Sequence, residues 1–462
     1  MNNTILKISL RLLIIKKLSS LLSLIVLTFG MASFMLIFFF IHYEKSYDES
    51  WTDSQQIYRI ALEKSQSNGN ITTTATNYGG LCRVIADEIP GVDYTTGFQR
   101  DIVTAYTTEH FIKDADFFWC DTSFFKLFDR PFLSGNHENP FPGLQSAVIS
   151  ETAALQLFGR TDPLNERFKL NEGWEFIVSG VFKDIPENSH LKIDILITRR
   201  SLHYFIDNFD NSSSTLKMGY ASRSTESSPS ARWLWENPNV YTYIRLKKNA
   251  DTELIKRAFS KICEKYTPHL VAIGQKSKFI LQPVQSIHLD SHYNSELSLN
   301  SDRKTITALY IIAMLALAMS WIIFINFQIT QSMERAKEIG LKKIAGATEY
   351  NILSQIVLQS VIINCIAIIL ALVLSFLLRP HLSEYLQLNG QIPVKPGSVL
   401  QFIIVFIIGA ILSSIYPAYI LISKRPQQLL SEKFVQDNDG FSLRRSLIII
   451  QFAASIGLMI TT

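Results

Sequence analysis

The stretch from Ile322 to Leu358, IIFINFQITQSMERAKEIGLKKIAGATEYNILSQIVL, decides the fold of this chain. It starts in an uncharged apolar run, passes through a charged amphipathic segment, Glu334–Thr348, and enters a second uncharged run. This pattern is typical of two membrane-spanning helices joined by a tight turn at the membrane surface. We name residues 334–348 the elbow and expect them to lie where a soluble partner can push on them.

The composition indicates a protein that is partly membrane-embedded and partly soluble. Of its 462 residues, 47% are hydrophobic and 18% are charged, and the mean hydropathy is +0.16. A spanning helix needs about 20 apolar residues, and four stretches reach that length: Leu18–Ile41, Ile306–Ile329, Ile352–Leu378 and Val399–Ile422. A fifth begins at Leu447 and reaches Thr462, slightly short of a full span. Either the chain is a fragment of a longer protein, which we favour, or it ends in an unfinished helix.

Basic residues gather in three of the segments that flank these runs. They are Lys7, Arg11, Lys16 and Lys17 before the first run, Arg335, Lys337, Lys342 and Lys343 between the second and third, and Lys424, Arg425, Lys433, Arg444 and Arg445 between the fourth and fifth. Short loops rich in Lys and Arg stay in the cytoplasm. We expect the N-terminus to be cytoplasmic, the first run to be an uncleaved anchor, and the region that follows it to be exported.

The predicted fold class is α+β: a membrane-helical bundle of four complete transmembrane helices plus a truncated fifth, with a large α+β extracytoplasmic domain inserted between helices 1 and 2. The predicted segments are a cytoplasmic N-terminus (1–17), transmembrane helix 1 (18–42), the exported domain (43–303), transmembrane helix 2 (304–330), the coupling elbow with its flanks (331–350), transmembrane helix 3 (351–379), a periplasmic loop (380–398), transmembrane helix 4 (399–423), a cytoplasmic linker (424–446) and the start of transmembrane helix 5 (447–462).

The exported region mixes strand-like and helix-like runs. We expect strands at Ala147–Ser150, Glu175–Val181, Val240–Leu246 and Phe279–Val284, helices at Ser150–Phe158 and Thr252–Tyr266, and a loop at Ser212–Ser230. In the second helix, Leu254, Ala258, Ile262 and Tyr266 recur every four residues and predict its apolar face. Three cysteines, Cys82, Cys120 and Cys263, are expected in the exported region, and Cys365 lies in a span. Three cysteines can form at most one disulfide, and the sequence does not indicate which pair would form it.

In the elbow, helical spacing places Leu341, Ile344, Ala345 and Thr348 on one side, which we expect to face the membrane or neighbouring spans. Arg335, Lys342 and Lys343 gather on the other side, around Ile339, where they would face a partner. Glu338 and Lys342 form a favourable i,i+4 pair, and Gly346 is placed to end the helix in a left-handed turn.

No nucleotide site or catalytic constellation is visible in the sequence. There is no G-x-x-x-x-G-K-[ST] phosphate loop, no H-E-x-x-H and no G-x-S-x-G. His288, Asp290 and His292 would share one face of a strand, but they lack a fourth metal ligand. Asp184, Glu187 and His190 are interpreted as a turn after a strand. Inside the spans, Asn326, Gln328, Gln359 and Asn364 are among the few amide side chains, and we expect Asn326 to form interhelical hydrogen bonds. We therefore predict a non-enzyme with no cofactor and no metal, and no basic stripe indicates nucleic-acid binding.

Motifs along nearly the whole chain resemble the FtsX/MacB family of ABC-transporter permeases, in the long form with a periplasmic core domain. The resemblance rests on the segments YEKSYD (43–48), IYR (57–59), FFKLF (124–128), FLSG (132–135), AVISE (147–151), LFG (157–159), VSGV (178–181), IPENSH (185–190), LQP (281–283) and IHL (287–289). The most diagnostic motif is ERAKEIG (334–340) with AGA (345–347), followed by IYPA (415–418) and KRP (424–426).

The resemblance implies a multi-pass protein of the inner membrane, with residues 43–303 in the periplasm as a MacB-like core domain. It also implies that ATP is hydrolysed by a separate cytoplasmic ABC ATPase, present as a dimer, and that the elbow couples to it. The expected coupling residues are Glu334, Arg335, Lys337, Glu338, Ile339, Gly340, Lys342, Lys343 and Gly346. Further expected partners are a second permease copy or the second half of a duplicated chain, a periplasmic adaptor or outer-membrane partner, and membrane lipid.

Two functions are compatible with this resemblance. The first is mechanotransmission, in which ATP hydrolysis moves the periplasmic domain to export or extract an envelope substrate such as a drug, a peptide or a lipoprotein. The second is a non-transporting signalling scaffold that regulates a cell-wall hydrolase or a sensor. The near absence of charge inside the predicted spans disfavours a polar conduit.

Overall fold

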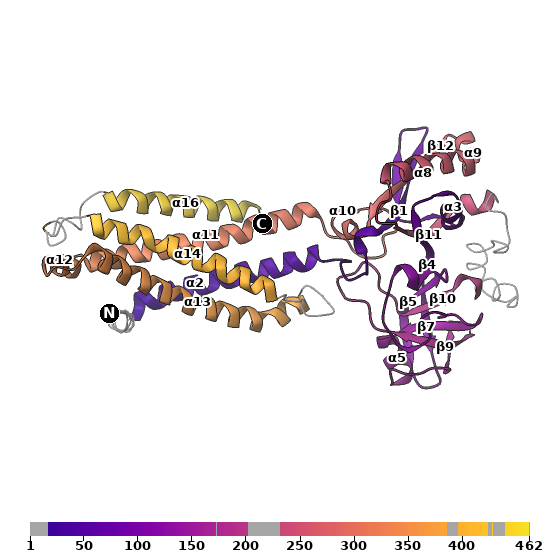
Figure 1. Cartoon of the computed structure of the whole chain (residues 1–462), viewed down its shortest axis with the longest axis horizontal. Coiled ribbons are helices and arrows are strands. Elements are labelled where there is room, and N and C mark those ends of the chain that lie inside the picture. The colour runs from indigo at the N-terminus through magenta and orange to yellow at the C-terminus, as the bar shows by residue number, and fades with distance from the viewer. Residues whose placement is uncertain are drawn as a thin grey trace. The chain divides into compact units, whose positions relative to one another are not determined.

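The computed structural model describes residues 17–171, 173–201, 232–385, 396–423, 427 and 439–461. The chain divides into two compact units (Figure 1): Met1–Tyr43 with Lys304–Thr462 form a helical unit, and Glu44–Arg303 form a mixed unit, hereafter the ectodomain. The predicted loop Ser212–Ser230 lies outside the described residues.

Long helices build the first unit. They are α2 (Lys17–Lys45), α11 (Arg303–Glu334), α12 (Ala336–Ile344), α13 (Glu349–Tyr385), α14 (Pro396–Ser423) and α16 (Asp439–Thr461). Within the described residues, three segments are long and apolar enough to cross a membrane: Leu21–Lys45, Arg303–Gln331 and Glu349–Tyr385. Shorter apolar segments, Val399–Ile415 and Arg445–Gly457, lie in α14 and α16. A membrane protein is therefore supported, whereas four complete spans and a partial fifth stay a prediction.

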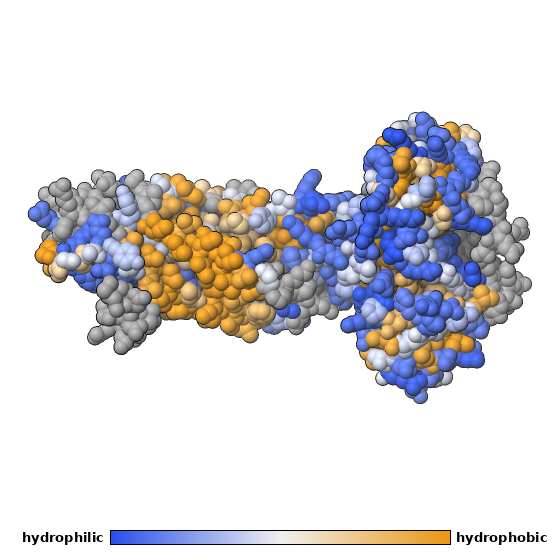
Figure 2. Space-filling model, viewed as in Figure 1, coloured by the Kyte–Doolittle hydropathy of each residue, from blue (hydrophilic) through white to orange (hydrophobic). Residues whose placement is uncertain are grey.

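Apolar side chains cover the outside of the helical unit as well as its interior (Figure 2). On α13, for example, Phe376 and Leu377 are exposed, as expected for side chains that face lipid. Inside, the ring of Phe402 on α14 lies 4.8 Å from Phe38 and 5.2 Å from Phe39 on α2. Gly30 lets α2 approach α11 closely, because a Cβ at Gly30 would lie 1.5 Å from Ser320 Oγ.

A twelve-stranded sheet organises the ectodomain (Figure 1), in the order β12-β1-β11-β4-β5-β10-β7-β9-β6. Strand β2 pairs with β1, β3 with β11, and β8 with both β4 and β9. Only the β5–β10 and β7–β9 pairs are parallel among the described strands. The strands are β1 (Ile57–Gln66), β2 (Ile71–Thr74), β3 (Asn77–Tyr78), β4 (Val92–Tyr106), β5 (Phe111–Cys120), β6 (Phe132–Gly135), β7 (Ser146–Ser150), β8 (Arg167–Leu170), β9 (Trp174–Phe182), β10 (Ile195–Thr198), β11 (Pro238–Leu246) and β12 (Gln275–Pro283).

Helices cover this sheet and complete separate apolar cores. They are α3 (Leu81–Glu88), α4 (Phe124–Leu127), α5 (Glu151–Phe158), α8 (Thr252–Tyr266), α9 (Pro268–Ala272) and α10 (Ile287–Asp290), with 3-10 turns η1 (Ser54–Gln56), η2 (Arg232–Trp235) and η3 (Val284–Ser286). One core packs α5 against β5, β7, β9 and β10, and another packs α3 and α8 against β1, β11 and β12. The long strand β4 contributes residues to both of these cores. Helices packed on a mixed sheet confirm the α+β prediction for this domain.

Most of the predicted local structure is confirmed. The strands expected at 147–150, 175–181, 240–246 and 279–284 correspond to β7, β9, β11 and β12, and the two expected helices correspond to α5 and α8. Ser150 caps α5 by accepting a hydrogen bond from the Ala153 amide at 3.1 Å. The predicted apolar face of α8 is partly wrong: Leu254 is exposed, and the buried side chains are those of Ile255, Phe259, Ile262 and Cys263.

The segment 287–292, expected to be the end of a strand, forms the short helix α10 instead. His288 and Asp290 therefore do not share the face of a strand. His288 lies 2.9 Å from the Glu44 carboxylate, and Asp290 accepts hydrogen bonds from Arg303. Among the described residues, no cluster of three His, Cys, Asp or Glu side chains is arranged to hold a metal ion.

The cysteines of the ectodomain are free thiols. Cys82, Cys120 and Cys263 are buried and form no disulfide, so the one disulfide that the sequence allowed is not formed. Burial raises the pKa of Cys82 to about 12 and that of Cys263 to about 12, and it also raises the pKa of Cys120. These thiols remain protonated at neutral pH and are expected to be unreactive.

A buried polar network joins the segment after α2 to the ectodomain core. The Asp48 carboxylate lies 2.8 Å from His190 Nδ1 and accepts a hydrogen bond from Ser189 Oγ at 2.6 Å, and His190 Nε2 lies 2.7 Å from the Tyr243 hydroxyl. Burial alone would raise the pKa of Asp48, but the charge and hydrogen bond of His190, with hydrogen bonds from Ser189 and Trp51, lower it below 3.8. His190 thus has a structural partner, which the sequence interpretation of a simple turn missed.

The Asp48→Asn substitution should lower the free energy of unfolding of the ectodomain by about 3–5 kcal/mol at neutral pH, because it breaks a buried ion pair. Asn tolerates the left-handed backbone at this position, where φ is 59°. The matched control is Asp53→Asn, at an exposed residue with φ 54°, which should leave stability nearly unchanged.

The measurement is thermal unfolding of the full chain, followed by tryptophan fluorescence as a function of pH. Because folding lowers the pKa of Asp48, its contribution is present above pH 3.8 and is lost as the pH falls through the lower folded value. The difference between wild type and Asp48→Asn should therefore shrink below pH 3.8. Equal stability of wild type and variant at neutral pH would refute the role given to this pair.

Candidate functional site: the elbow between α11 and α13

The elbow consists of the end of α11, the short helix α12 and the turn that leads into α13. The helical path breaks once at Arg335, where φ is −96° and ψ is 1°, and resumes at Ala336. Hydrogen bonds still cross this break, because the Arg335 amide donates to Gln331 O at 3.3 Å and the Ile339 amide donates to Arg335 O at 3.0 Å. α12 therefore continues from α11 with a local change of direction.

Gly346 ends α12 as predicted. It adopts φ 89°, the left-handed region that Gly enters without the steric cost of a Cβ. The Ala347 amide donates to Lys342 O at 2.9 Å and the Gly346 amide to Lys343 O at 3.1 Å, which is the pair of bonds that defines a Schellman ending. The Asn351 amide then donates to Thr348 Oγ1 at 3.4 Å, so Thr348 starts the next helix.

The inner face of α12 packs against α13. Ala336, Ile339 and Ile352 form a small buried apolar cluster, with Ala347 and Ile356 against it. Leu341, Ile344, Ala345 and Thr348, which were expected to face the membrane or neighbouring spans, are exposed and pack on no described helix, so a membrane-facing orientation stays a prediction. Helical periodicity selected this side as the apolar one, and the approach of α13 buries Ile339 on the other side.

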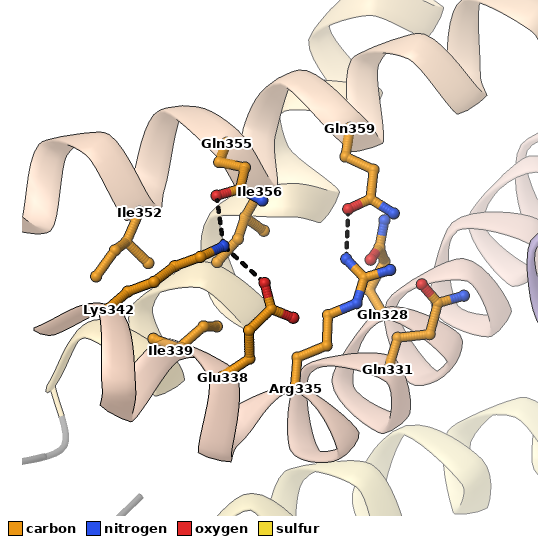
Figure 3. A pocket seen from close by; sticks show the side chains of 10 residues that line it. All are labelled: Gln328, Gln331, Arg335, Glu338, Ile339, Lys342, Ile352, Gln355, Ile356 and Gln359. Atoms are coloured by element: carbon orange, nitrogen blue, oxygen red, sulfur yellow. Dashed lines mark hydrogen bonds and ion pairs between the residues drawn. The ribbon is translucent and has the colours of Figure 1, made fainter. Parts of the chain in front are cut away.

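Two basic side chains turn toward α13 (Figure 3). Arg335 Nη1 donates a hydrogen bond to Gln359 Oε1 at 2.6 Å. Lys342 Nζ reaches Glu338 Oε1 at 2.7 Å and Gln355 Oε1 at 3.3 Å. Both side chains thus bond within the chain, and their contact with a partner stays a prediction, whereas the predicted Glu338–Lys342 pair is confirmed.

These side chains border a polar hollow of about 20 Å³ between α11, α12 and α13. A space of this size holds about one water molecule, since one needs roughly 10–15 Å³ of accessible volume. The residues around it are Gln328, Gln331, Arg335, Glu338, Ile339, Lys342, Ile352, Gln355, Ile356 and Gln359 (Figure 3). The hollow is too small for a substrate, so its polar groups hold the helices together.

The remaining expected coupling residues divide between the surface and the interior. Lys337 and Glu338 are exposed, Lys343 is half-buried, and Ile339 and Gly340 are buried. α11 includes Glu334, but its side chain lies outside the described part of the structure. Around the hollow lie Arg335, Glu338, Ile339 and Lys342, whereas Lys337 does not line it.

The amides inside the spans form hydrogen bonds between and within helices. Gln328 on α11 donates to Ser360 Oγ on α13 at 2.8 Å, an interhelical bond. Gln359 accepts the bond from Arg335, and Asn364 donates within its own helix to Ser360 O. The side-chain oxygen of Asn326 is buried without a hydrogen-bond partner among the described residues, so the interhelical bond expected of this side chain stays a prediction.

The outer surface of the elbow and of the first turn of α13 carries apolar side chains that the described chain leaves exposed. Leu341 is 61% exposed, Ile344 64% and Tyr350 74%. We name these three residues the outer patch. The sequence did place Leu341 and Ile344 on one apolar side of the helix. Which side of the helix packs against the protein could not be identified without the position of α13.

Gly346→Ala should weaken the end of α12 by about 1–2 kcal/mol, because a Cβ in the left-handed region is strained. The added Cβ would meet no atom within 4 Å, so the effect comes from the backbone alone. Hydrogen exchange of the amides of Gly346 and Ala347 should accelerate by about 5–30-fold. Gly397→Ala is the control, in a helix and equally uncrowded. Equal exchange in Gly346→Ala and wild type would contradict the proposed turn.

Comparison with known proteins places both parts of the chain. Residues 20–262 match the MacB-like periplasmic core domain, and residues 310–426 match the FtsX-like permease C-terminal domain. The Macrolide export ATP-binding/permease protein MacB of Bdellovibrio bacteriovorus is 24% identical over 278 residues. The match covers 59% of this chain and 36% of that protein, so the chain spans about a third of the curated relative's length.

Solved structures of related domains are more distant. A domain of a putative permease from Porphyromonas gingivalis is 17% identical, with a TM-score of 0.41, covering 51% of this chain and 92% of that one. The periplasmic region of MacB from Actinobacillus actinomycetemcomitans is 10% identical, with a TM-score of 0.33, covering 51% and 91%. The extracellular domain of the ABC-type transporter YknZ from Gram-positive bacteria is 13% identical, with a TM-score of 0.31, covering 48% and 99%.

The match to the periplasmic core domain alone covers more than half of the chain, and the match to the permease domain continues it through the elbow and α13. This chain therefore belongs to the FtsX/MacB family of ABC-transporter permeases.

Proposed function

We propose that this chain is the mechanotransmission subunit of an ABC transporter, in which a separate cytoplasmic ATPase pushes on the elbow and the ectodomain moves in response. The observation that carries this proposal is the elbow itself. It is held on its inner face by α13 and leaves the apolar outer patch uncovered by the described chain, an arrangement suited to docking a partner. Family membership supports an ATPase as that partner.

The elbow and the first turns of α13, which would receive the push of the ATPase, are joined by several contacts and would move together. Ile339 and Ile352 pack together, Arg335 bonds to Gln359, and Lys342 bonds to Gln355, so α12 is tied to the first turns of α13 by apolar and polar contacts. α12 also follows directly from α11. A displacement of the elbow therefore moves the ends of both helices together.

The output side is the short helix α10 in the ectodomain. Its His288 lies 2.9 Å from the Glu44 carboxylate at the end of α2, and the Tyr47 ring stacks on the His288 ring at 3.4 Å with an interplanar angle of 3°. Its Asp290 accepts two hydrogen bonds of 2.6 Å from Arg303, the first residue of α11. α10 thus contacts both chain segments by which the ectodomain joins the membrane helices.

These contacts support a relay from helix ends into the sheet. Asp48 lies just past α2 and is anchored to His190 and Ser189, while His190 reaches Tyr243 on β11. Movement of α2 would therefore pass to the ectodomain through buried bonds, and movement of α11 through the exposed Arg303–Asp290 pair, without a polar path through the spans. A permease that works as a lever needs such connections and no conduit.

For the client, we favour export or extraction of an envelope substrate over a signalling scaffold. Support comes from the curated relative, whose name describes macrolide export. A second permease copy, or the second half of a duplicated chain, would complete the membrane part, and a periplasmic adaptor or outer-membrane partner would receive the client. The inner membrane is the proposed location, with the N-terminus cytoplasmic and residues 43–303 periplasmic.

The double variant Leu341→Asp/Ile344→Asp should abolish co-purification of the ATPase and its stimulated ATP turnover. Both side chains are exposed, so the fold should survive, whereas a docking site would gain two unpaired charges. A change of about 3 kcal/mol or more, over a hundredfold in affinity, is expected when charges enter an apolar contact. The control is Leu299→Asp, an ectodomain leucine that is 96% exposed. If the double variant bound the ATPase as strongly as the wild type does, the proposed docking surface would be refuted.

His288→Ala should separate input from output. It removes the Glu44 contact and the Tyr47 stack, so the ATPase should still bind while the ectodomain stops responding. The response is the ATP-dependent fluorescence change of a probe attached at Leu299→Cys, measured with Cys365→Ser because Cys365 is exposed. We expect a loss of at least about tenfold, equivalent to about 1.4 kcal/mol.

The control for this test is His292→Ala, at an exposed histidine four residues further along. It should respond as wild type does. If His288→Ala keeps the full response and remains folded by thermal unfolding, α10 does not carry the output.

A further inference from the structure

Strand β12 forms one edge of the twelve-stranded sheet. It pairs with β1 from Tyr58↔Pro283 to Gln66↔Gln275, and among the described strands nothing pairs with its other side. The backbone amides and carbonyls along this side are therefore open to another extended chain, except that the backbone of Phe279 is hydrogen-bonded to Cys263 of α8. β12 lies beside α8 and α9 (Figure 1), so the open edge is flanked by helices.

A hollow of about 950 Å³ runs along this edge. Every residue of β12 from Lys276 to Leu281 lines it, from both faces of the strand, so the hollow curves around the open edge. Six residues of a strand span roughly 20 Å at about 3.4 Å per residue. The hollow therefore has the length of a short extended peptide and a volume at the upper end of the range for ligand sites, about 300–1,000 Å³.

The wall opposite β12 is one face of α8. Phe259, Cys263 and Thr267 recur on it at helical spacing and line the hollow, and Val271 of α9 extends the wall. An edge strand beside a helix is the geometry in which an added strand bonds through its backbone while its side chains fill pockets against the helix. Val271 is 54% exposed at this wall, which leaves apolar area for such a side chain.

The charges along the edge decide between possible occupants. Lys276 and Lys278 are exposed on the same face of β12, and Lys256 lies on the rim. If two copies of this chain paired edge to edge through β12, these lysines would face the same lysines, which is unfavourable. An extended segment that carries acidic side chains would instead be attracted. Glu63, which contacts Lys278 at 3.6 Å, and Glu264 reduce the positive charge but do not reverse it.

We propose that the groove between β12 and α8 binds an extended, acidic polypeptide segment of a partner protein by strand addition to β12. The partner's backbone would bond to the open edge, an apolar side chain would lie against Val271, and acidic side chains would face Lys276 and Lys278. This site lies wholly in the ectodomain and does not rest on ATPase coupling. It is tested without nucleotide or ATPase, so its failure leaves the proposed function untouched.

The probe is a fluorescein-labelled octapeptide of alternating Asp and Val, titrated against the full chain in detergent and followed by fluorescence anisotropy. Two further peptides have the same sequence but carry N-methyl groups on alternate amides, in the even or the odd register. In strand addition only one set of amides faces β12. One N-methyl peptide should therefore bind as the parent does, and the other should bind at least about tenfold more weakly, which corresponds to loss of about 1.4 kcal/mol.

Variants of the chain provide matched pairs. Val271→Asp, on the wall, should weaken binding of the parent peptide at least about tenfold, whereas Ile273→Asp, at a 66% exposed residue that does not line the hollow, should not. Lys276→Glu should weaken binding, whereas Lys261→Glu, on α8 outside the hollow, should not. All four positions are on the surface, so the fold should be retained.

Saturable binding that depends on N-methyl register and on Val271 would support the site. No binding up to about 1 mM, equal binding of both N-methyl peptides, or unchanged binding to Val271→Asp would overturn it. Loss of chain self-association in Val271→Asp without any peptide binding would also overturn it, because the occupant would then be a second copy.

Discussion

A helix that crosses a bilayer must satisfy its backbone hydrogen bonds internally, because the lipid offers none. This constraint leaves the apolar middle of α11 with little freedom to bend or to exchange hydrogen bonds with a partner. Its two ends are where it contacts polar groups. At one end Arg335 and α12 lie against α13, and at the other Arg303 lies against α10. The proposed mechanism places input at the first end and output at the second.

The two ends are built differently, and the difference fits their proposed roles. The elbow combines an apolar cluster around Ile339 with side-chain bonds to glutamines, so it resists separation from α13. The contacts of α10 are polar and use charged groups, Glu44, Asp290 and Arg303. A receiving surface benefits from stiffness, whereas a connection between a helix end and a folded domain needs direction, which hydrogen bonds to charged groups provide.

Sequence reasoning predicted much of this architecture because the signals were local. Apolar runs predicted the helices, β-branched and aromatic runs predicted β7, β9 and β11, and Gly346 predicted the end of α12. The family followed from motifs spread along the chain, and the two family matches confirm it. What it could not predict depended on distant contacts. His190 meets Asp48 across 142 positions, and His288 meets Glu44 across 244.

In the elbow, too, contacts with a distant part of the chain could not be predicted from the sequence. Its residues were selected as helical and amphipathic, but Ile339 lies on the side that the basic residues marked as polar. Only the approach of Ile352 from α13 decides that Ile339 is buried and Leu341 exposed. Likewise, the basic character of Arg335 and Lys342 was plain from sequence, whereas their direction depends on Gln359 and Gln355 in the next helix.

A relay across the membrane requires the elbow and the ectodomain to lie in different compartments. The direct measurement is labelling of single cysteines, Lys337→Cys in the elbow and Leu299→Cys in the ectodomain, by a membrane-impermeant maleimide in cells whose outer membrane has been permeabilised. We predict immediate labelling at position 299 and labelling at position 337 only after the inner membrane is broken. Labelling of both positions before that rupture would contradict the relay.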